Sequence, residues 1–265
     1  GHKLTITGNL IHSGGTILVN GGELEVQGDY RVQALNGTNY TTSTGILDMT
    51  NKADTVKVLG DFVMQSTQSH KGKLTSGTLE IGGDLTQLSG GSYQNFYTSD
   101  THTVILNGSE KQTVSIYNNS KDRCMINNLK ITNTSDEGVV FSGTVYVTGN
   151  LYNTNSNLIN SSYIYITNSA SLEDGQWNHS ITFAEGRTIT EDTTINGELK
   201  IIDGTTILEA DLNVYGDLYL NGCTMDLNGH SLTVNKNLYI SFGGSTTYLK
   251  INKGKLYVNE NLNIQ

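Results

Sequence analysis

Residues 163–187 (YIYITNSASLEDGQWNHSITFAEGR) contain the side chains best suited to chemistry in this chain. Glu173 and Asp174 are neighbouring carboxylates, and the single tryptophan, Trp177, follows them, with His179 two residues later. Two carboxylates on one face can act as acid and base on a glycosidic bond, and an indole ring can stack on a sugar. The segment therefore predicts a sugar site with an aromatic platform.

Catalysis at this segment is the less favoured interpretation. Adjacent residues of a strand point to opposite faces, so Glu173 and Asp174 can converge only from a loop. The same holds for a second doublet, Glu191 and Asp192. Glu-Asp-Gly is also a common turn sequence. We therefore predict no catalytic residue and no enzyme, and keep a polysaccharide lyase or glycoside hydrolase as the second alternative.

Sugar binding without cleavage requires only exposed planar aromatics with amides, carboxylates and hydroxyls around them. The segment SYQNFYTS carries three aromatic residues in a part of the chain with little repeat character, and two tyrosines precede Trp177. The predicted ligand-binding residues are Tyr93, Phe96, Tyr97, Tyr163, Tyr165, Glu173, Asp174 and Trp177.

A repeated sequence motif, which we call the phrase, must position these side chains. An alternating apolar segment ends in Gly-Asp or Gly-Asn and restarts with an apolar residue, as in LTITGNLIH, LEVQGDYRV, VKVLGDFVM and LEIGGDLTQ. The residues that anchor the copies are Ile6, Val26, Val58, Ile81, Val147, Val214, Val234 and Val258. They are separated by 20, 32, 23, 66, 67, 20 and 24 residues, and the two long gaps are close to three units of 22. Such a period is typical of a solenoid, whose units bury their apolar faces by stacking.

The units are predicted to be short strands joined by corners. Strand formers alternate with polar residues, and the intervening Gly-Asp, Asn-Gly and Gly-Gly pairs supply positive φ at turns. The chain has no proline, which suits a stack that uses nearly every backbone N–H. Parallel crossovers prefer the right hand. We predict an all-β fold, a right-handed parallel β-helix (β-solenoid) with roughly 20–24 residues per coil, forming one domain over residues 1–265.

The repeat loosens over residues 33–45, 89–130 and 163–187, where function is usually added to a solenoid. Residues 33–45 are predicted to form a loop on the side of the stack. Tyr30, Tyr219 and Tyr239 instead occupy repeat positions, so they are predicted to stack as ladders.

The repeated acidic or amide position could suggest a calcium ladder. It is occupied by Asn9, Asp29, Asp61, Asp84, Asn150, Asp217, Asn237 and Asn261. Half of these residues are Asn, and the calcium-binding nonapeptide GGxGxDxUx is absent. Side-chain-to-backbone bonds at turns explain the position better. We predict no metal site and no cofactor, and we expect the isolated Cys124 and Cys223 to be buried.

Charge and composition limit the partners. The net charge is −9 and the three arginines are scattered, so a nucleic-acid partner is excluded. No apolar run is long enough to span a bilayer. The repeat is under way at Leu4 and still running at Gln265, which predicts a segment excised from a longer protein. Neighbouring domains of that protein are then partners, and the exposed strand edges at the ends predict end-to-end self-association.

The units LTITGNL, ELEVQGDY and TLEIGGDL, with HTVILNGSEKQTVS at residues 102–115, carry a resemblance. They resemble the Asn/Gly-rich β-solenoid segments of large secreted or surface proteins of Gram-positive, clostridia-like bacteria, and the resemblance covers residues 4–265. It implies a stalk, adhesive module or carrier segment, and it supplies no catalytic motif. The chain is also weakly similar to tāpirin-type cellulose adhesins, through its general style and the loop that contains Trp177.

These observations predict a non-catalytic, secreted or cell-surface bacterial module that acts in adhesion. Its predicted ligand is a plant cell-wall or cell-surface polysaccharide, and the alternative is a passive structural stalk of a large surface protein. An adhesive module predicts exposed aromatics gathered on one face, with Trp177 among them. A stalk predicts aromatics distributed as ladders.

Overall fold

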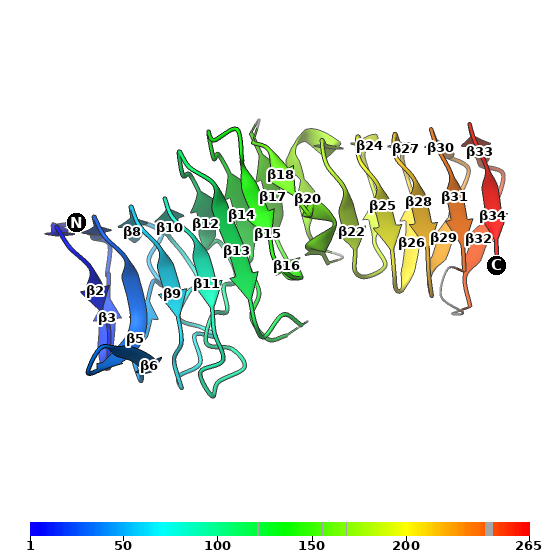
Figure 1. The fold of residues 1–265 in the computed structure, drawn as a ribbon. Coiled ribbons are helices and arrows are strands. Elements are labelled where there is room, and N and C mark those ends of the chain that lie inside the picture. The colour runs from blue at the N-terminus through cyan, green and yellow to red at the C-terminus, as the bar shows by residue number, and fades with distance from the viewer. Residues whose placement is uncertain (121, 155, 168, 242–245) are drawn as a thin grey trace. The chain divides into compact units, whose positions relative to one another are not determined.

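The computed structural model describes residues 1–120, 122–154, 156–167, 169–241 and 246–265. This described part consists of short strands joined by turns and loops, with parallel pairing except in one hairpin, and of two 3-10 turns, η1 (Ser161–Tyr163) and η2 (Glu173–Gly175) (Figure 1). Contacts divide the chain into two compact units, Gly1–Ile159 and Asn160–Gln265, here called unit 1 and unit 2. Each unit is a β-solenoid, so the predicted all-β parallel β-helix is confirmed.

Unit 1 has three faces, and each coil adds one segment to each face. The first face stacks β1 (Lys3–Ile6), β4 (Glu23–Val26), β8 (Thr55–Val58), β10 (Thr78–Ile81), β12 (Thr103–Leu106), β14 (Asn128–Ile131) and β17 (Asn150–Asn153). The second stacks β2 (Leu10–Ile11), β5 (Tyr30–Asn36), β9 (Phe62–Met64), β11 (Leu85–Gln87), β13 (Gln112–Ile116), β15 (Val139–Phe141) and β18 (Leu158–Ile159). The third contains β3 (Thr16–Leu18), β7 (Ile46–Asp48) and β16 (Val145–Val147), and isolated bridges such as Met49 to Leu74 continue it.

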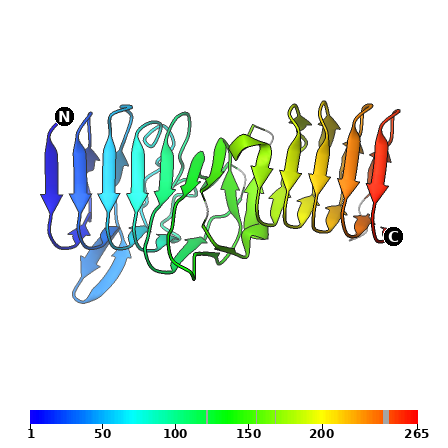
Figure 2. The same ribbon diagram turned by 90° about the horizontal axis from the view of Figure 1, so that it is seen from above.

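Unit 2 also has three faces, and Figure 2 shows the strands of its successive coils side by side. One face stacks β19 (Ile164–Ile166), β22 (Ile181–Phe183), β25 (Leu199–Ile201), β28 (Leu218–Leu220), β31 (Leu238–Ile240) and β34 (Leu262–Ile264). Another stacks β21 (Gln176–Trp177), β24 (Thr193–Ile195), β27 (Leu212–Val214), β30 (Ser231–Val234) and β33 (Lys255–Val258). The last stacks β23 (Thr188–Ile189), β26 (Thr205–Leu208), β29 (Thr224–Asp226) and β32 (Tyr248–Lys250), while β20 (Ser171–Leu172) precedes η2.

The core is a set of columns of like residues, because register aligns the same position of each coil. Leu24 pairs with Val56, and Val56 pairs with Leu79 in the next coil. All three side chains are buried, while the alternate residues of the same strands are more exposed and face outward. Burying each such side chain contributes about 1.5–3 kcal/mol, so the alternating pattern alone determines which face of each strand points inward.

A second set of bonds links the turns of successive coils. At several of the repeated Asp and Asn positions, the side-chain Oδ1 accepts the backbone N–H of the equivalent residue in the following coil. The N–H of Asp29 donates to Asn9 at 2.8 Å, that of Asp61 to Asp29 at 3.0 Å, and that of Asp84 to Asp61 at 2.9 Å. In unit 2 the N–H of Asn237 donates to Asp217 at 2.9 Å. The predicted structural role of this position is confirmed.

The glycine before each Asp has a different role from the predicted one. Gly28, Gly60 and Gly83 do not have positive φ, so a left-handed backbone does not explain them. A Cβ on Gly60 would lie 2.8 Å from the backbone carbon of Gly28 and 2.6 Å from Oδ1 of Asp29. At these three positions of unit 1, consecutive turns approach too closely for a side chain, whereas in unit 2 Lys236 occupies the equivalent position before Asn237.

The length of the coils varies more than the sequence period predicts. The coil from Leu24 to its partner Val56 is long, as the separation of 32 residues between Val26 and Val58 predicts. The predicted side loop within residues 33–45 is a β-hairpin. The second strand of the hairpin is β6 (Asn39–Thr42), antiparallel to β5. In unit 2, the coil from Ile181 to its partner Leu199 is shorter than predicted.

The first long gap between copies of the phrase, which follows Ile81, contains three coils, as predicted. The residue that completes the third coil is not the predicted one. The column of Ile81 continues through Leu106 and Ile131 to Asn153. Val147, the predicted next anchor, instead pairs with Ile126 on the third face. The phrase VYVTGN therefore turns a different corner of the coil.

Replacing Gly60 with Ala should destabilise unit 1 by about 1–3 kcal/mol, the typical cost of overpacking. The matched control is Gly8→Ala, since Gly8 occupies the same repeat position in the first coil and a Cβ there meets nothing within 4 Å. Urea unfolding of both variants measures the difference. Equal midpoints for the two variants would contradict the close-approach explanation.

Candidate functional site

Trp177 occupies the anchor position of the repeat. It pairs with Ile195, which pairs with Val214 in the following coil, and it is only 1% exposed. Ser180 takes the place of the repeated Asp, and its Oγ accepts the N–H of Glu198 at 3.1 Å. The sequence Trp-Asn-His-Ser is therefore a degenerate copy of the phrase, which pattern matching missed because the glycine and the acid are both replaced.

The predicted platform of Trp177 with flanking carboxylates is therefore not formed. Asp174 is exposed in the turn η2 with a φ of 48°, and Glu173 beside it is half-buried. The Glu-Asp-Gly sequence thus forms a turn, while the indole ring packs in the core. Tyr163 is the exposed last residue of η1, and Tyr165 is a half-buried residue of β19. The expectation that Trp177 stands on an exposed face is wrong.

The three aromatics of SYQNFYTS have separate environments. Phe96 is fully buried, with its ring centroid 5.9 Å from that of Phe62, so its predicted exposure is also wrong. Tyr97 is half-buried, with the Lys71 ammonium 5.4 Å above its ring centroid. Tyr93 is 63% exposed. Of the three, Tyr93 is thus the ring most accessible to a ligand.

Tyr93 borders a shallow groove of about 500 Å³, which we name the Tyr93 groove. Its lining residues are Gly91, Ser92, Tyr93, Gln94, Asp122 and Arg123. The Arg123 guanidinium lies 4.6 Å from the Tyr93 ring centroid, and Gln94 Nε2 donates to the carbonyl oxygen of Asp122 at 2.9 Å. An aromatic ring among amide, hydroxyl, carboxylate and guanidinium groups has the composition of a sugar-binding surface.

The base of this groove is fixed to the core by Cys124. Its buried thiol lies 3.3 Å from both the carbonyl oxygen of Tyr93 and Oδ1 of Asn95, so its single S–H proton is shared between these two acceptors. Burial raises the pKa of the Cys124 thiol to about 11, so the group remains protonated and able to donate at neutral pH. The buried position that the sequence predicts for Cys124 and Cys223 is confirmed.

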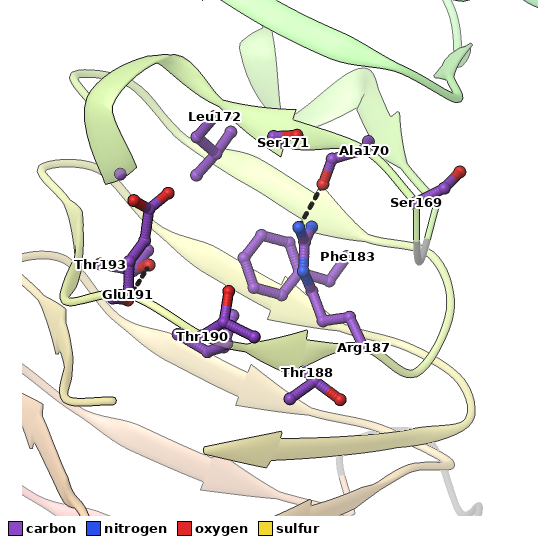
Figure 3. Close-up of a pocket in the computed structure, with 12 residues that line it drawn as sticks. Ser169, Ala170, Ser171, Leu172, Phe183, Arg187, Thr188, Thr190, Glu191 and Thr193 are labelled. Atoms are coloured by element: carbon purple, nitrogen blue, oxygen red, sulfur yellow. Dashed lines mark hydrogen bonds between the residues drawn. The ribbon is translucent and has the colours of Figure 1, made fainter. Parts of the chain in front are cut away.

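A second cavity, of about 240 Å³, lies in unit 2 between the η2 turn and β23; we name it the Arg187 pocket (Figure 3). Arg187 Nη2 donates to the carbonyl oxygen of Ala170, and the guanidinium lies 4.6 Å from the Phe183 ring centroid. Glu191 borders the same cavity. Burial lowers the pKa of Arg187 to about 10, which still leaves the group charged at neutral pH.

The predicted segment 163–187 thus does line a cavity, but with residues other than those predicted. No motif in the sequence indicates Arg187, which stands alone between a glycine and a threonine. Glu191 stands out in the sequence only as half of an acidic doublet. Their juxtaposition depends on the short coil that brings β20 and β23 to the same cavity, and no motif encodes that length.

No protein family, curated protein or solved structure that was compared with the chain matches it. Within the described ranges, no group of three His, Cys, Asp or Glu residues is arranged to hold a metal ion. A search of the same ranges finds no helix with the length and apolar character needed to cross a membrane.

The buried position of Trp177 predicts a specific optical property. Because it is the single tryptophan, the intrinsic indole fluorescence of the native protein should be blue-shifted and quenched only slowly by iodide. Trp177→Ala should lower the stability by about 3–5 kcal/mol, as expected for removal of a core indole. Red-shifted native emission with rapid quenching would mean that the ring is exposed.

Proposed function

We propose that this protein is a non-catalytic β-solenoid module that acts in adhesion by binding polysaccharide through the Tyr93 groove. The observation that carries the proposal is the exposed Tyr93 ring at the edge of a groove otherwise lined by polar groups. The resemblance to segments of bacterial surface proteins supports a secreted or cell-surface location and a cell-wall or cell-surface glycan as the ligand.

The Tyr93 ring is suited to stacking because its orientation is restrained before a ligand arrives. Arg123 lies over the ring, and the Cys124 thiol bonds to the Tyr93 carbonyl oxygen from the core. A restrained aromatic side chain loses little conformational entropy on binding, so more of the stacking energy is retained as affinity.

The polar groups around the ring are also oriented. The N–H of Gln94 donates to Ser92 Oγ at 3.2 Å, and Ser69 Oγ donates to Gln94 Oε1 at 3.4 Å. Asp122 and Arg123 add an acceptor and several donors at the groove. Sugar hydroxyls both donate and accept, so this mixed lining matches a glycan better than a purely apolar ligand. The groove is shallow, as binding along a polymer chain requires.

The lining of the groove supports binding without cleavage. Asp122 is the single carboxylate among the described residues that line it. Hydrolysis of a glycosidic bond by the usual acid and base mechanism uses two carboxylates flanking the bond. The adjacent Arg123 and Gln94 are groups that hold a sugar in place.

One observation favours the second candidate, a stiff structural spacer. The rings of Tyr219 and Tyr239 are stacked 4.7 Å apart with an interplanar angle of 6°, as the sequence predicts for a ladder. The predicted ladder position of Tyr30 differs, because its ring is buried and meets Phe62 edge-on. Stacked outer rings reinforce coil-to-coil packing without any ligand.

Binding to insoluble polysaccharide tests the proposal. The purified protein should be retained on at least one of cellulose, xylan, pectin and chitin, without release of soluble sugars. Tyr93→Ala should weaken retention at least about ten-fold, since truncating a central aromatic contact costs about 2 kcal/mol or more. Tyr215→Ala is the matched control, because Tyr215 is 50% exposed in unit 2 and borders neither the Tyr93 groove nor the Arg187 pocket.

Two outcomes would contradict the proposal. No retention on any polymer would leave the spacer as the better account. Retention that Tyr93→Ala and Tyr215→Ala reduce equally would remove the Tyr93 groove as the binding site.

A further inference from the structure

We propose that the Arg187 pocket is a second ligand site, which binds the carboxylate of an acidic sugar residue of the uronic acid type. The site is built from unit 2 alone and is independent of the Tyr93 groove.

The guanidinium of Arg187 has donors that no described residue satisfies. Nη2 donates to the carbonyl oxygen of Ala170, but the buried Nε and Nη1 have no hydrogen-bond partner in the described part of the chain. Among the described residues, no carboxylate lies within ion-pair distance of Arg187. A buried charge without a partner is costly and is rare in structural roles. Both atoms are covered in this structure, so an anionic group in the pocket would satisfy them once the Arg187 side chain turns toward the cavity.

The guanidinium is also held in position for such a group. Figure 3 shows it beside the Ala170 carbonyl, with the Phe183 ring next to it and the cavity alongside. The guanidinium carbon lies 4.6 Å from the centroid of the fully buried Phe183 ring, a cation–π contact that keeps the charge beside the cavity. A planar guanidinium is the side chain best matched to carboxylate geometry.

The other end of the pocket determines the charge that a ligand can carry. Glu191 lies across the cavity from Arg187, with Thr190 between them (Figure 3). Its carboxylate repels a dianion such as phosphate but accepts hydrogen bonds from hydroxyl groups. A ligand with one carboxylate and several hydroxyls fits both ends at once. An acidic sugar has this combination.

The volume is consistent with a single sugar unit. The cavity holds about 240 Å³, below the range of about 300–1,000 Å³ that is typical of sites for drug-sized ligands. A uronate at the end or along the side of a glycan could enter while the rest of the chain stays outside.

Calorimetric titration of the full chain with glucuronate and galacturonate tests this proposal, with glucose and inorganic phosphate as comparisons. At least one uronate should bind saturably and raise the melting temperature, while glucose, which lacks the carboxylate, should bind at least ten-fold more weakly. Phosphate should also bind more weakly than the uronate because of Glu191. This part of the test needs no variant, so it cannot fail through misfolding.

Two variants assign the binding to the pocket. Arg187→Gln should abolish uronate binding while the variant still unfolds in one cooperative transition, at a somewhat lower temperature because the contacts with Ala170 and Phe183 are lost. Arg31→Gln is the matched control and should leave uronate binding unchanged. The Arg31 guanidinium also lies 4.8 Å from an aromatic ring centroid, that of Tyr40, but Arg31 borders neither the Tyr93 groove nor the Arg187 pocket. Glu191→Gln should strengthen phosphate binding relative to uronate binding.

The outcomes separate this proposal from that of the Tyr93 groove. Absence of saturable uronate binding by the native protein overturns the acidic-sugar site and leaves polymer retention through Tyr93 unaffected. Phosphate binding as tight as uronate binding also overturns the assignment. Uronate binding that Arg187→Gln leaves intact, or that Arg31→Gln abolishes, places the ligand outside the Arg187 pocket.

Discussion

The close approach of consecutive coils is the constraint on which the rest of the structure depends. Strands in a parallel stack are spaced by about 4.8 Å. Each turn has to keep that spacing while it directs the chain from one face of the coil to the next. At the turns, Gly60 allows two backbones to touch, and Asp61 bonds to the N–H of the following coil. The Gly-Asp pair is therefore an inter-coil connector, in which the glycine provides room and the acid provides the bond.

This constraint also explains where binding features can arise. A residue inside the stack repeats its neighbour's environment, so a distinct site needs a local departure from the repeat. Tyr93 lies in the coil between Ile81 and Leu106, which is longer than the predicted period. The Arg187 pocket lies where residues of β20, η2 and β23 line one cavity. Both sites are anchored to the core, through Cys124 and Phe183 respectively, so their groups are held by the rigid part of the fold.

The fold was predictable because its two signals are local: the alternation of apolar residues and the Gly-Asp phrase. Where the phrase is absent, as between Asp84 and Val145, register depends on loop lengths, which are not periodic. The environment of Trp177 was not predictable for a related reason. A large aromatic looks like a recognition residue in sequence, but pairing with Ile195 places it at an inward position. The Arg187 pocket was not predictable either, because its main property is a missing partner, which only the three-dimensional surroundings reveal.

Amide hydrogen exchange, resolved by residue with NMR, tests the inter-coil connector most directly. The account predicts that the turn amides of Asp61 and Asp84 exchange as slowly as strand amides, and much more slowly than Gly37 and Thr38 in the exposed hairpin turn. In Asp61→Ala, the Asp84 amide should lose its protection, while the amide of residue 61 should keep the bond to Asp29 and remain slow. Fast exchange of both amides in the native protein, or unchanged protection of Asp84 in the variant, would contradict the account.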